Sequence, residues 1–353
     1  DDRIVFDGEN FVIFYLTNDA DLTFNGLTFQ NITGEAFGTA FQAAWGCQNG
    51  TWKDVTFTNC NFTNNTAGYG SVMMVTGLNV SIIDCNFSGN YGSSRGAIWD
   101  IWNNLYVSNT SFENNTSTGD GGAICATTDS NYTLRIENST FEGNYTNGHG
   151  GAVFSEMSNT FISDSVFTNN TAGKSAGAVT TATGANSTKQ VTIDGCEFTG
   201  NKANAGDAGA LRVYNFNGVT LNLTDSTFED NTATGAGGAL QVSGCNYTID
   251  GCLFGGNVSN GSFTNGGAIH SGYGGTCTIS NSQFIENLAT GLYAGKGGAI
   301  HFTDQNGNIT ISDSEFFDNQ AYAPDYYWAW GGAINREYGS GTLSLYNCSI
   351  VGN

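Results

Sequence analysis

The chain has 353 residues, with 10 Lys and Arg against 31 Asp and Glu and a formal net charge of −21. Such an acidic surface repels phosphate backbones and anionic lipids, and no apolar stretch is long enough to cross a bilayer, so we expect neither nucleic acid binding nor membrane insertion. Because 39% of the residues are hydrophobic and 13% are aromatic, the chain is expected to fold around a core in spite of its 50 Gly.

The first residues lead into an internal repeat that runs through the whole chain. Residues 1–28 contain strand-like hydrophobic segments around Ile4 and Phe14 but lack the full motif, so they are expected to form an incomplete N-terminal coil. From there an aromatic marker recurs twelve times between residues 29 and 350, about every 29 residues. The markers are Phe29, Phe62, Phe87, Phe112, Phe141, Phe167, Phe198, Phe228, Phe254, Phe284, Phe316 and the replacement Ile350.

The residues before each marker follow a strand and corner pattern. Apolar residues lie seven and five positions before the marker, as Val191 and Ile193 do before Phe198, and this spacing of two is typical of a β-strand. Three positions before the marker only Gly, Asn or Asp occurs. These residue types tolerate a left-handed backbone, so the strand is predicted to turn there. The next residue is small in most copies, as expected of a packed inward site.

Two further motifs complete the repeat. Asn lies three positions after the marker in every copy except the first, and equivalent Asn side chains in stacked rungs can form a hydrogen-bonded ladder. After a variable loop comes Gly-Gly-Ala plus an aliphatic residue, as at 237–240 and 266–269, with looser versions at Gly96, Gly177 and Gly209. Each repeat is therefore predicted to form three short strands and three corners.

Stacked coils of this kind bury one continuous hydrophobic column, which a single coil cannot do alone. We therefore predict an all-β, right-handed parallel β-helix of about 11–12 coils, forming a single domain over residues 1–353, with the hand taken from the general preference of parallel crossovers. The one Pro, Pro324, lies in a long loop where it interrupts no strand pairing. A β-propeller needs about 40–45 residues per blade and does not fit the repeat.

The paired motifs, such as Phe228 to Asn231 followed by Gly237 to Leu240, resemble the repeats of chlamydial polymorphic membrane proteins and of adhesin-like surface proteins of methanogenic archaea. The resemblance covers nearly the whole chain. It implies a right-handed β-helix displayed outside the cell as an adhesin or passenger domain. No anchoring segment is recognised, so the mode of attachment stays open.

The nine Cys residues leave at least one without a partner within the chain. Five occupy the small inward position before a marker and Cys277 occupies an apolar strand site, which favours buried free thiols. Cys60 and Cys85 hold the same position in adjacent coils, where their Cα atoms would lie about 5 Å apart, so this pair is the disulfide candidate. Since no Cys-x-x-Cys motif occurs, we expect no metal site, and no cofactor is indicated.

Twenty Asn-x-Ser/Thr sequons suit a secreted, glycosylated surface. The glycosylation candidates are Asn64, Asn114, Asn169, Asn222 and Asn308. The corner sequence Asn-Asn-Thr also produces sequons by itself, so a structural role for these Asn residues is the competing interpretation.

No catalytic residue is predicted, although many β-helices act on polysaccharides. Hydrolysis needs two carboxylates across a groove. Most of the available Asp residues, including Asp84, Asp164, Asp225 and Asp313, are explained by the corner position. The Gly-His-Gly triplet at residues 148–150 is similar to a polygalacturonase motif, but the other motifs of that family are missing.

His270 and His301 each follow the aliphatic residue of a Gly-Gly-Ala-Ile motif, so they are predicted to stack in adjacent coils. Since the neighbouring coils offer only Gln241 and Asn335, we favour a neutral surface ladder over a metal site. The whole row at this position is expected to line one outer face: Trp99, Cys125, Phe154, Thr180, Arg212, Gln241, His270, His301 and Asn335.

The most distinctive loops connect the last markers to their Gly-Gly-Ala strands. The distance from the marker to the second Gly is about 10 residues in the middle of the chain but 13, 14 and 16 after Phe254, Phe284 and Phe316. We expect these loops, including the aromatic loop at 317–331, to cluster on one edge and to bind a ligand or partner. The alternative is that they shield the end of the core. The binding candidates are Phe263, Tyr293, Tyr322, Tyr326, Tyr327, Trp328 and Trp330.

Together these features predict an extracellular, surface-displayed, adhesin-like or structural β-helix that binds a protein or glycan on a host or neighbouring cell. One alternative is a subunit of an extracellular filament or sheath. Apolar residues such as Phe11, Leu345 and Ile350 crowd both ends, so identical chains could stack end to end as a homo-polymer. The other alternative is a polysaccharide lyase or hydrolase.

Overall fold

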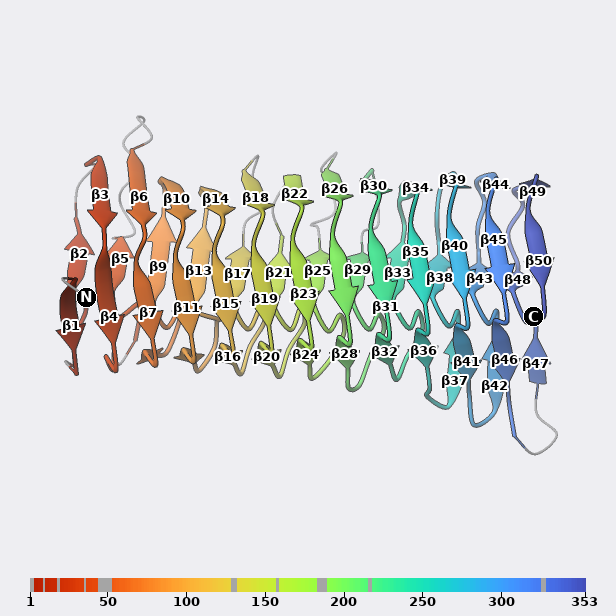
Figure 1. Ribbon diagram of the computed structural model, residues 1–353, viewed down its shortest axis with the longest axis horizontal. Helices are drawn as coiled ribbons and strands as arrows, with labels where there is room; N and C mark the ends of the chain where they lie inside the picture. The colour runs from red at the N-terminus through yellow and green to blue at the C-terminus, as the bar shows by residue number, and fades with distance from the viewer. Residues whose placement is uncertain are drawn as a thin grey trace.

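The computed structural model describes residues 3–8, 10–17, 20–34, 36–43, 53–127, 132–156, 159–182, 189–214, 218–324 and 328–353. All strands within these ranges pair in parallel with strands of the coils before and after, and the coils stack into an elongated rod (Figure 1). None of the described residues forms a helix that could span a membrane.

Each regular coil passes through four sheets, named here in chain order. The predicted right-handed parallel β-helix is confirmed, and sheets of twelve and thirteen strands agree with the predicted stack of coils. The sequence predicts three strands per coil, and the structure adds a fourth, of two residues in most coils, directly after the conserved Asn. Two residues are too few to show a strand period, which is why the pattern does not reveal this element.

The first sheet holds the strand that precedes the left-handed corner. Its alternate side chains point into the core and are buried, as Val191 and Ile193 are. Its strands are β3 (Leu22–Asn25), β6 (Asp54–Thr58), β10 (Asn79–Ile83), β14 (Asn104–Ser108), β18 (Thr133–Glu137), β22 (Asn159–Ser163), β26 (Gln190–Asp194), β30 (Thr220–Thr224), β34 (Asn246–Asp250), β39 (Cys277–Ser280), β44 (Ile309–Ser312) and β49 (Leu343–Tyr346).

The second sheet holds the markers. Neighbouring marker rings stack with centroids 4.5 to 5.2 Å apart and form a continuous buried column. The strands are β1 (Ile4–Asp7), β4 (Leu27–Gln30), β7 (Asn61–Thr63), β11 (Asn86–Ser88), β15 (Ser111–Glu113), β19 (Thr140–Glu142), β23 (Val166–Thr168), β27 (Glu197–Thr199), β31 (Thr227–Glu229), β35 (Leu253–Gly255), β40 (Gln283–Ile285), β45 (Glu315–Phe317) and β50 (Ser349–Val351).

The third sheet consists of the short strands that follow the conserved Asn. Its ten strands run along the lower edge of the rod (Figure 1). They are β8 (Thr66–Ala67), β12 (Tyr91–Gly92), β16 (Thr116–Ser117), β20 (Tyr145–Thr146), β24 (Thr171–Ala172), β28 (Lys202–Ala203), β32 (Thr232–Ala233), β36 (Val258–Ser259), β41 (Leu288–Thr290) and β46 (Gln320–Tyr322).

The fourth sheet begins, in the copies with the motif, at the aliphatic residue of Gly-Gly-Ala. That residue points into the core, as Ile124 and Ile300 do. The strands are β2 (Phe14–Leu16), β5 (Phe41–Ala43), β9 (Met73–Thr76), β13 (Ile98–Ile101), β17 (Ile124–Thr127), β21 (Val153–Ser155), β25 (Val179–Ala182), β29 (Leu211–Tyr214), β33 (Leu240–Ser243), β38 (Ile269–Gly272), β43 (Ile300–Thr303) and β48 (Ile334–Glu337).

The predicted left-handed corners are confirmed. All twelve residues three positions before a marker have φ angles between 47° and 67°. A second corner of the same kind, which the sequence pattern did not reveal, lies directly before the ladder Asn, for example at Asn64 with a φ of 55° and at Gly143 with 62°. Even Glu286, a residue type that rarely adopts a left-handed backbone, has a φ of 55° at this position. The stacking of the coils therefore imposes the corner on every copy.

The predicted Asn ladder is confirmed as well. Ten fully buried Asn residues, from Asn65 to Asn319, each donate from Nδ2 to the Oδ1 of the next Asn at 2.7 to 3.0 Å. In Asn170, Nδ2 also donates to the carbonyl oxygen of Phe141, and Oδ1 accepts from the backbone and side chain of Asn144. Every polar atom of the amide is therefore paired, which removes the desolvation penalty of burying it.

Each residue type of the Gly-Gly-Ala motif is explained by a different structural requirement. The first Gly has a positive φ, for example 69° at Gly237. The second Gly has no room for a side chain, since a Cβ on Gly238 would lie 2.0 Å from the carbonyl oxygen of Gly267 in the next coil. The Ala is a fully buried core residue, as at Ala239. Close stacking of the coils thus requires this motif.

Candidate functional site

The three long loops near the C-terminal end form a small sheet of their own, which we call the flange. It consists of β37 (Phe263–Asn265), β42 (Ala294–Lys296) and β47 (Trp328–Trp330), paired in parallel. The flange projects below the rod beside the third sheet (Figure 1). The prediction that these loops cluster on one edge is therefore confirmed.

The inner side of the flange lies directly on the third sheet. A Cβ on Gly295 would lie 2.4 Å from the carbonyl oxygen of Ala289 and 2.5 Å from that of Tyr322, so only Gly permits this approach. Thr264, next to Gly295 in register, is fully buried. The flange is thus a packed layer on β41 and β46.

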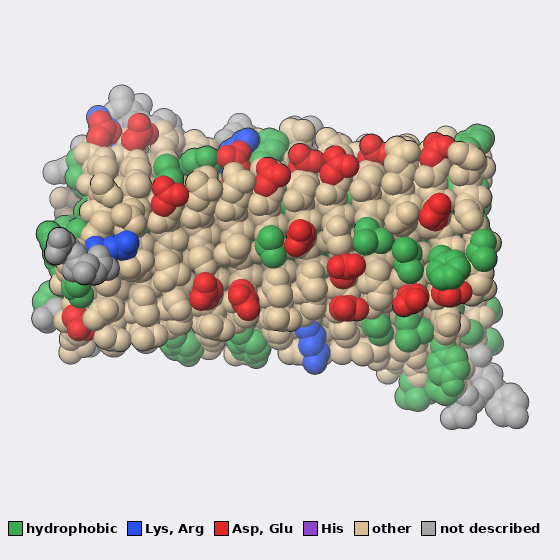
Figure 2. All heavy atoms as spheres, viewed as in Figure 1, with side chains coloured by type: hydrophobic (Ala, Val, Ile, Leu, Met, Phe, Trp, Pro, Cys, Tyr) green, Lys and Arg blue, Asp and Glu red, His purple; other side chains and the backbone are tan. Residues whose placement is uncertain are grey.

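The opposite side of the flange and its surroundings expose aromatic rings. The exposed fractions are 63% for Phe263, 39% for Tyr293, 55% for Tyr322, 61% for Trp328 and 42% for Trp330. In Figure 2 hydrophobic side chains gather at the lower corner of this end, and Asp and Glu side chains are spread along the length of the same face. Some of these rings also contact one another, so the alternative that the loops shield the end of the core stays open.

The orientation of Trp330 is set by its neighbours. The Nζ atom of Lys296 lies 4.9 Å from the centre of the Trp330 ring, and the ring of Trp328 stacks beside it at 5.7 Å and 17°. Lys296 is itself held by Glu337 of the fourth sheet, with 2.9 Å between Nζ and Oε1. Sequence reasoning missed Lys296 and Glu337; the available signal was that Lys296, one of only ten cations, directly precedes a Gly-Gly-Ala motif.

Of the other predicted binding residues, three lie within the described residues and two do not. Phe263 and Tyr293 contact each other, with ring centroids 5.3 Å apart. Tyr322 lies on β46, which begins at a depression lined by Glu286, Asp318 and Gln320. Tyr326 and Tyr327 lie outside the described residues. That the group binds a ligand stays a prediction.

Much of the outward row of the fourth sheet is buried, with only Trp99, Arg212 and His270 partly exposed, which corrects the sequence-based expectation of an outer face. Cys125, Thr180 and His301 are at most 1% exposed. The loops that lead into the fourth sheet close over the row; a Cβ on Gly297, for example, would lie 3.0 Å from the backbone nitrogen of His301. The sequence places these residues outside the core correctly but does not show that a second layer covers them.

His270 and His301 stack as predicted, with ring centroids 5.6 Å apart and planes at 10°. Burial lowers the pKa of His270 to about 4 and, together with His270 and Lys296, lowers the pKa of His301 to about 3. The pair is therefore neutral at physiological pH. Among the described residues no group of three or more His, Cys, Asp or Glu side chains is placed to hold a metal ion.

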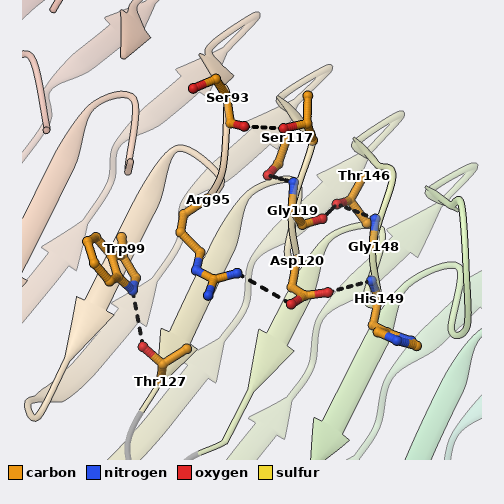
Figure 3. A network of polar contacts seen from close by, with 11 residues as sticks. Ser93, Arg95, Trp99, Ser117, Gly119, Asp120, Thr127, Thr146, Gly148 and His149 are labelled. Carbon is orange, nitrogen blue, oxygen red and sulfur yellow. Dashed lines mark hydrogen bonds and ion pairs between the residues drawn. The ribbon is translucent and has the colours of Figure 1, made fainter. Parts of the chain in front are cut away.

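In the middle coils the loop residues are tied to one another (Figure 3). Nη1 of Arg95 lies 3.4 Å from Oδ2 of Asp120, whose Oδ1 accepts a hydrogen bond from the backbone nitrogen of His149 at 2.9 Å. Nδ1 of His149 accepts from the backbone nitrogen of Ser175 at 3.4 Å, and burial lowers the pKa of His149. The triplet at 148–150 therefore has a structural role in joining coils.

Two of three acidic side chains that line one depression have structural roles too. A depression of about 410 Å³ on the first sheet is lined by Glu137, Asp164 and Asp194. Asp164 is a left-handed corner residue. Glu137 forms an ion pair with Arg135 and accepts a hydrogen bond from Tyr106 at 2.9 Å.

Cys60 and Cys85 are free, buried thiols that lie next to each other. The backbone nitrogen of Cys60 donates to Sγ of Cys85 at 3.4 Å. The hydrogen bond between the two side chains lowers the pKa of Cys60 to about 7 and, with burial, raises that of Cys85. A disulfide between them, which would need an oxidant, stays a prediction.

The five glycosylation candidates are exposed or half-buried, but their side chains also serve the structure. Asn64, Asn114 and Asn169 are left-handed corner residues with φ angles of 54° to 55°. Oδ1 of Asn222 accepts from Thr248, and Oδ1 of Asn308 accepts from Thr342. Glycosylation of any of them stays a prediction.

Hydrophobic side chains are exposed at both ends of the described stack. Phe11 at one end and Leu345 and Ile350 at the other are more than 40% exposed. End-to-end association of identical chains is a prediction that this structure does not test.

Comparison with known proteins places the chain in a fold family. The family described as "Right handed beta helix region" matches residues 12–188, 100–284 and 183–353. The chain is also similar to "Probable autotransporter YfaL" of Escherichia coli (strain K12), with 36% identity over 103 residues that cover 29% of this chain and 6% of that protein. No solved structure matches the chain significantly. The likeness to chlamydial and archaeal repeats stays a prediction, but the chain belongs to the right-handed β-helix family.

Proposed function

We propose that the chain is a surface-displayed β-helix that recognises a ligand on a host or neighbouring cell through the flange. The exposed aromatic rings of the flange carry this proposal. Aromatic side chains with limited rotamer freedom, when exposed together, are typical of recognition surfaces. The β-helix fold and the partial similarity to an autotransporter support display outside the cell.

The separation of the stacked coils from the flange supports a binding role. The stacked coils form a rigid rod, and the flange lies near one end of it (Figure 1). The net charge of −21 supports the same role, because it repels other anionic molecules and so disfavours non-specific binding along the rod. Specific binding is then expected at the flange. Some acidic residues that would suggest an enzyme have other roles, since Asp164 is a corner residue and Glu137 forms an ion pair.

Attachment of the purified protein to a panel of host and microbial cells tests this proposal. We expect the variant Phe263→Ser, Trp328→Ser, Trp330→Ser to lose attachment by more than about tenfold, since central aromatic residues contribute about 2 kcal/mol or more each to binding. The matched control replaces Tyr91 and Tyr145, two exposed aromatic residues of the third sheet, with Ser. Unchanged attachment of a folded flange variant would remove the flange from the function.

A further inference from the structure

Resting on this proposed function, we infer that the ligand of the flange is an uncharged glycan chain that stacks on the exposed ring of Trp328 and packs along the exposed edge of Trp330. The two rings lie nearly parallel, and each keeps a large exposed area. The C–H groups on the face of a sugar ring are apolar and slightly positive, which complements the negative face of an aromatic ring.

The size of the flange favours a glycan over a folded protein. Three strands of three residues cover roughly 10 Å by 10 Å, since strands lie about 4.8 Å apart and rise about 3.3 Å per residue. A stable protein interface buries about 800 Å² on each partner, several times that footprint. A few sugar rings in a row match the available area.

The rings are held in place before a ligand arrives. Lys296 lies against one face of Trp330 and is fixed by Glu337, so the ring cannot turn freely. The carbonyl oxygen of Trp330 also accepts from Nδ2 of Asn335 at 3.5 Å. Such pre-organisation lowers the entropic cost of binding and lets a small surface hold a ligand.

The charges around the flange select against acidic glycans. The strands β41 and β46, on which the flange packs, begin at a depression lined by Glu286, Asp318 and Gln320. Lys296, the cation at the flange, is already paired with Glu337. Carboxylates of a uronic acid polymer would meet these acidic groups, whereas the hydroxyl and acetamido groups of a neutral chain can donate to them.

The test measures retention of the full chain on neutral polysaccharides (cellulose, chitin, xylan and mannan) and on acidic ones (polygalacturonate and alginate). We expect retention on at least one neutral polymer, at least tenfold weaker retention for Trp328→Ala with Trp330→Ala, and none on the acidic polymers. The control Tyr91→Ala with Tyr145→Ala should bind like the wild type. Far-ultraviolet circular dichroism and the melting temperature establish that each variant is folded.

Two outcomes would overturn the glycan inference. The first is that no neutral polymer retains the wild type, or that a folded flange variant is retained equally well. The second is flange-dependent attachment to cells that survives periodate oxidation of cell-surface glycans but is lost after protease treatment. In that second case the flange still recognises a partner, so the proposed function stands and only the ligand class is wrong.

Discussion

The middle coils and the flange come from the same part of the repeat, the loop between the marker and Gly-Gly-Ala, but they use their side chains differently. In the middle coils that loop is short, and residues such as Arg95, Asp120 and His149 bind neighbouring loops. In the last coils the longer loops form an extra layer whose rings face solvent. In the regular coils the polar loop side chains bind neighbouring coils. Only the extra residues of the longer loops are available to bind a ligand.

The largest expected effect of a single substitution tests the regular coils through the Asn ladder. Asn170→Ala removes four hydrogen bonds made by one fully buried side-chain amide and leaves the carbonyl of Phe141 and the amide of Asn144 without these partners. We expect a loss of about 3–5 kcal/mol in the free energy of unfolding, measured by urea denaturation. The outward-facing control Asn86→Ala and the flange variant Trp328→Ala should each lose less than about 1 kcal/mol. Equal losses of unfolding free energy in all three variants would contradict the conclusion that the Asn ladder stabilises the regular coils more than the flange does.

The next effect concerns an exception within the regular core. Asp100 is fully buried between Val75 and Ala126 of the neighbouring coils, and Asn103 donates to its Oδ1. Burial raises its pKa to about 8. Since this lies above the unfolded value of about 4, the stabilising protonated form is fully present below pH 4 and is lost as the pH rises towards 8.

Asp100→Asn should therefore stabilise the protein by about 4 kcal/mol at pH 7 and by less than about 0.5 kcal/mol at pH 4. Thermal unfolding of both forms over this pH range measures the difference. The exposed corner variant Asp84→Asn serves as the control, because its side chain is not in the core. A gain that does not depend on pH would show that the carboxyl group of Asp100 is not the cause.

Acid should weaken the end of the rod beneath the flange. The folded pKa values of His270 and His301, about 4 and 3, lie below the unfolded value of about 6.5. Their neutral forms therefore stabilise the fold above pH 6.5, and this contribution is lost as the pH falls towards 4. Relative to the double variant His270→Gln, His301→Gln, the wild type should lose about 6 kcal/mol between pH 7 and pH 4, about 3 kcal/mol for each His. Parallel pH profiles would contradict the buried, neutral state of the pair.

The smallest effect concerns two of the copies of the motif that lack the first Gly. Ala176 and Ala208 have φ angles of 59° and 62° at the position where other coils have Gly. Ala176→Gly and Ala208→Gly should each stabilise the chain by about 0.5–1 kcal/mol in urea denaturation, because relief of left-handed strain exceeds the added chain entropy. The reverse change Gly237→Ala should destabilise it. A loss of stability in both Gly variants would show that the corner is not strained.

Local spacing in the sequence predicted most of the stack. The Phe markers, the Gly, Asn or Asp corners and the ladder Asn recur at fixed distances, and each distance has a direct physical meaning in a strand or a turn. The long loops were likewise visible as extra residues after Phe254, Phe284 and Phe316. What these patterns determine is the coil, its repetition and the place where the repetition is broken.

Only the tertiary structure shows which loops bury which side chains. The row from Trp99 to Asn335 points away from the core, as its spacing requires, yet loops of the same coils bury much of it, because Gly residues such as Gly297 let the backbone approach. The contact of Lys296 with Trp330 and Glu337 joins two sheets and residues up to 41 positions apart. Burial and pairing of this kind depend on distances across coils, which no local pattern contains, so the sequence determined the repeat and only the stacked structure determined the site.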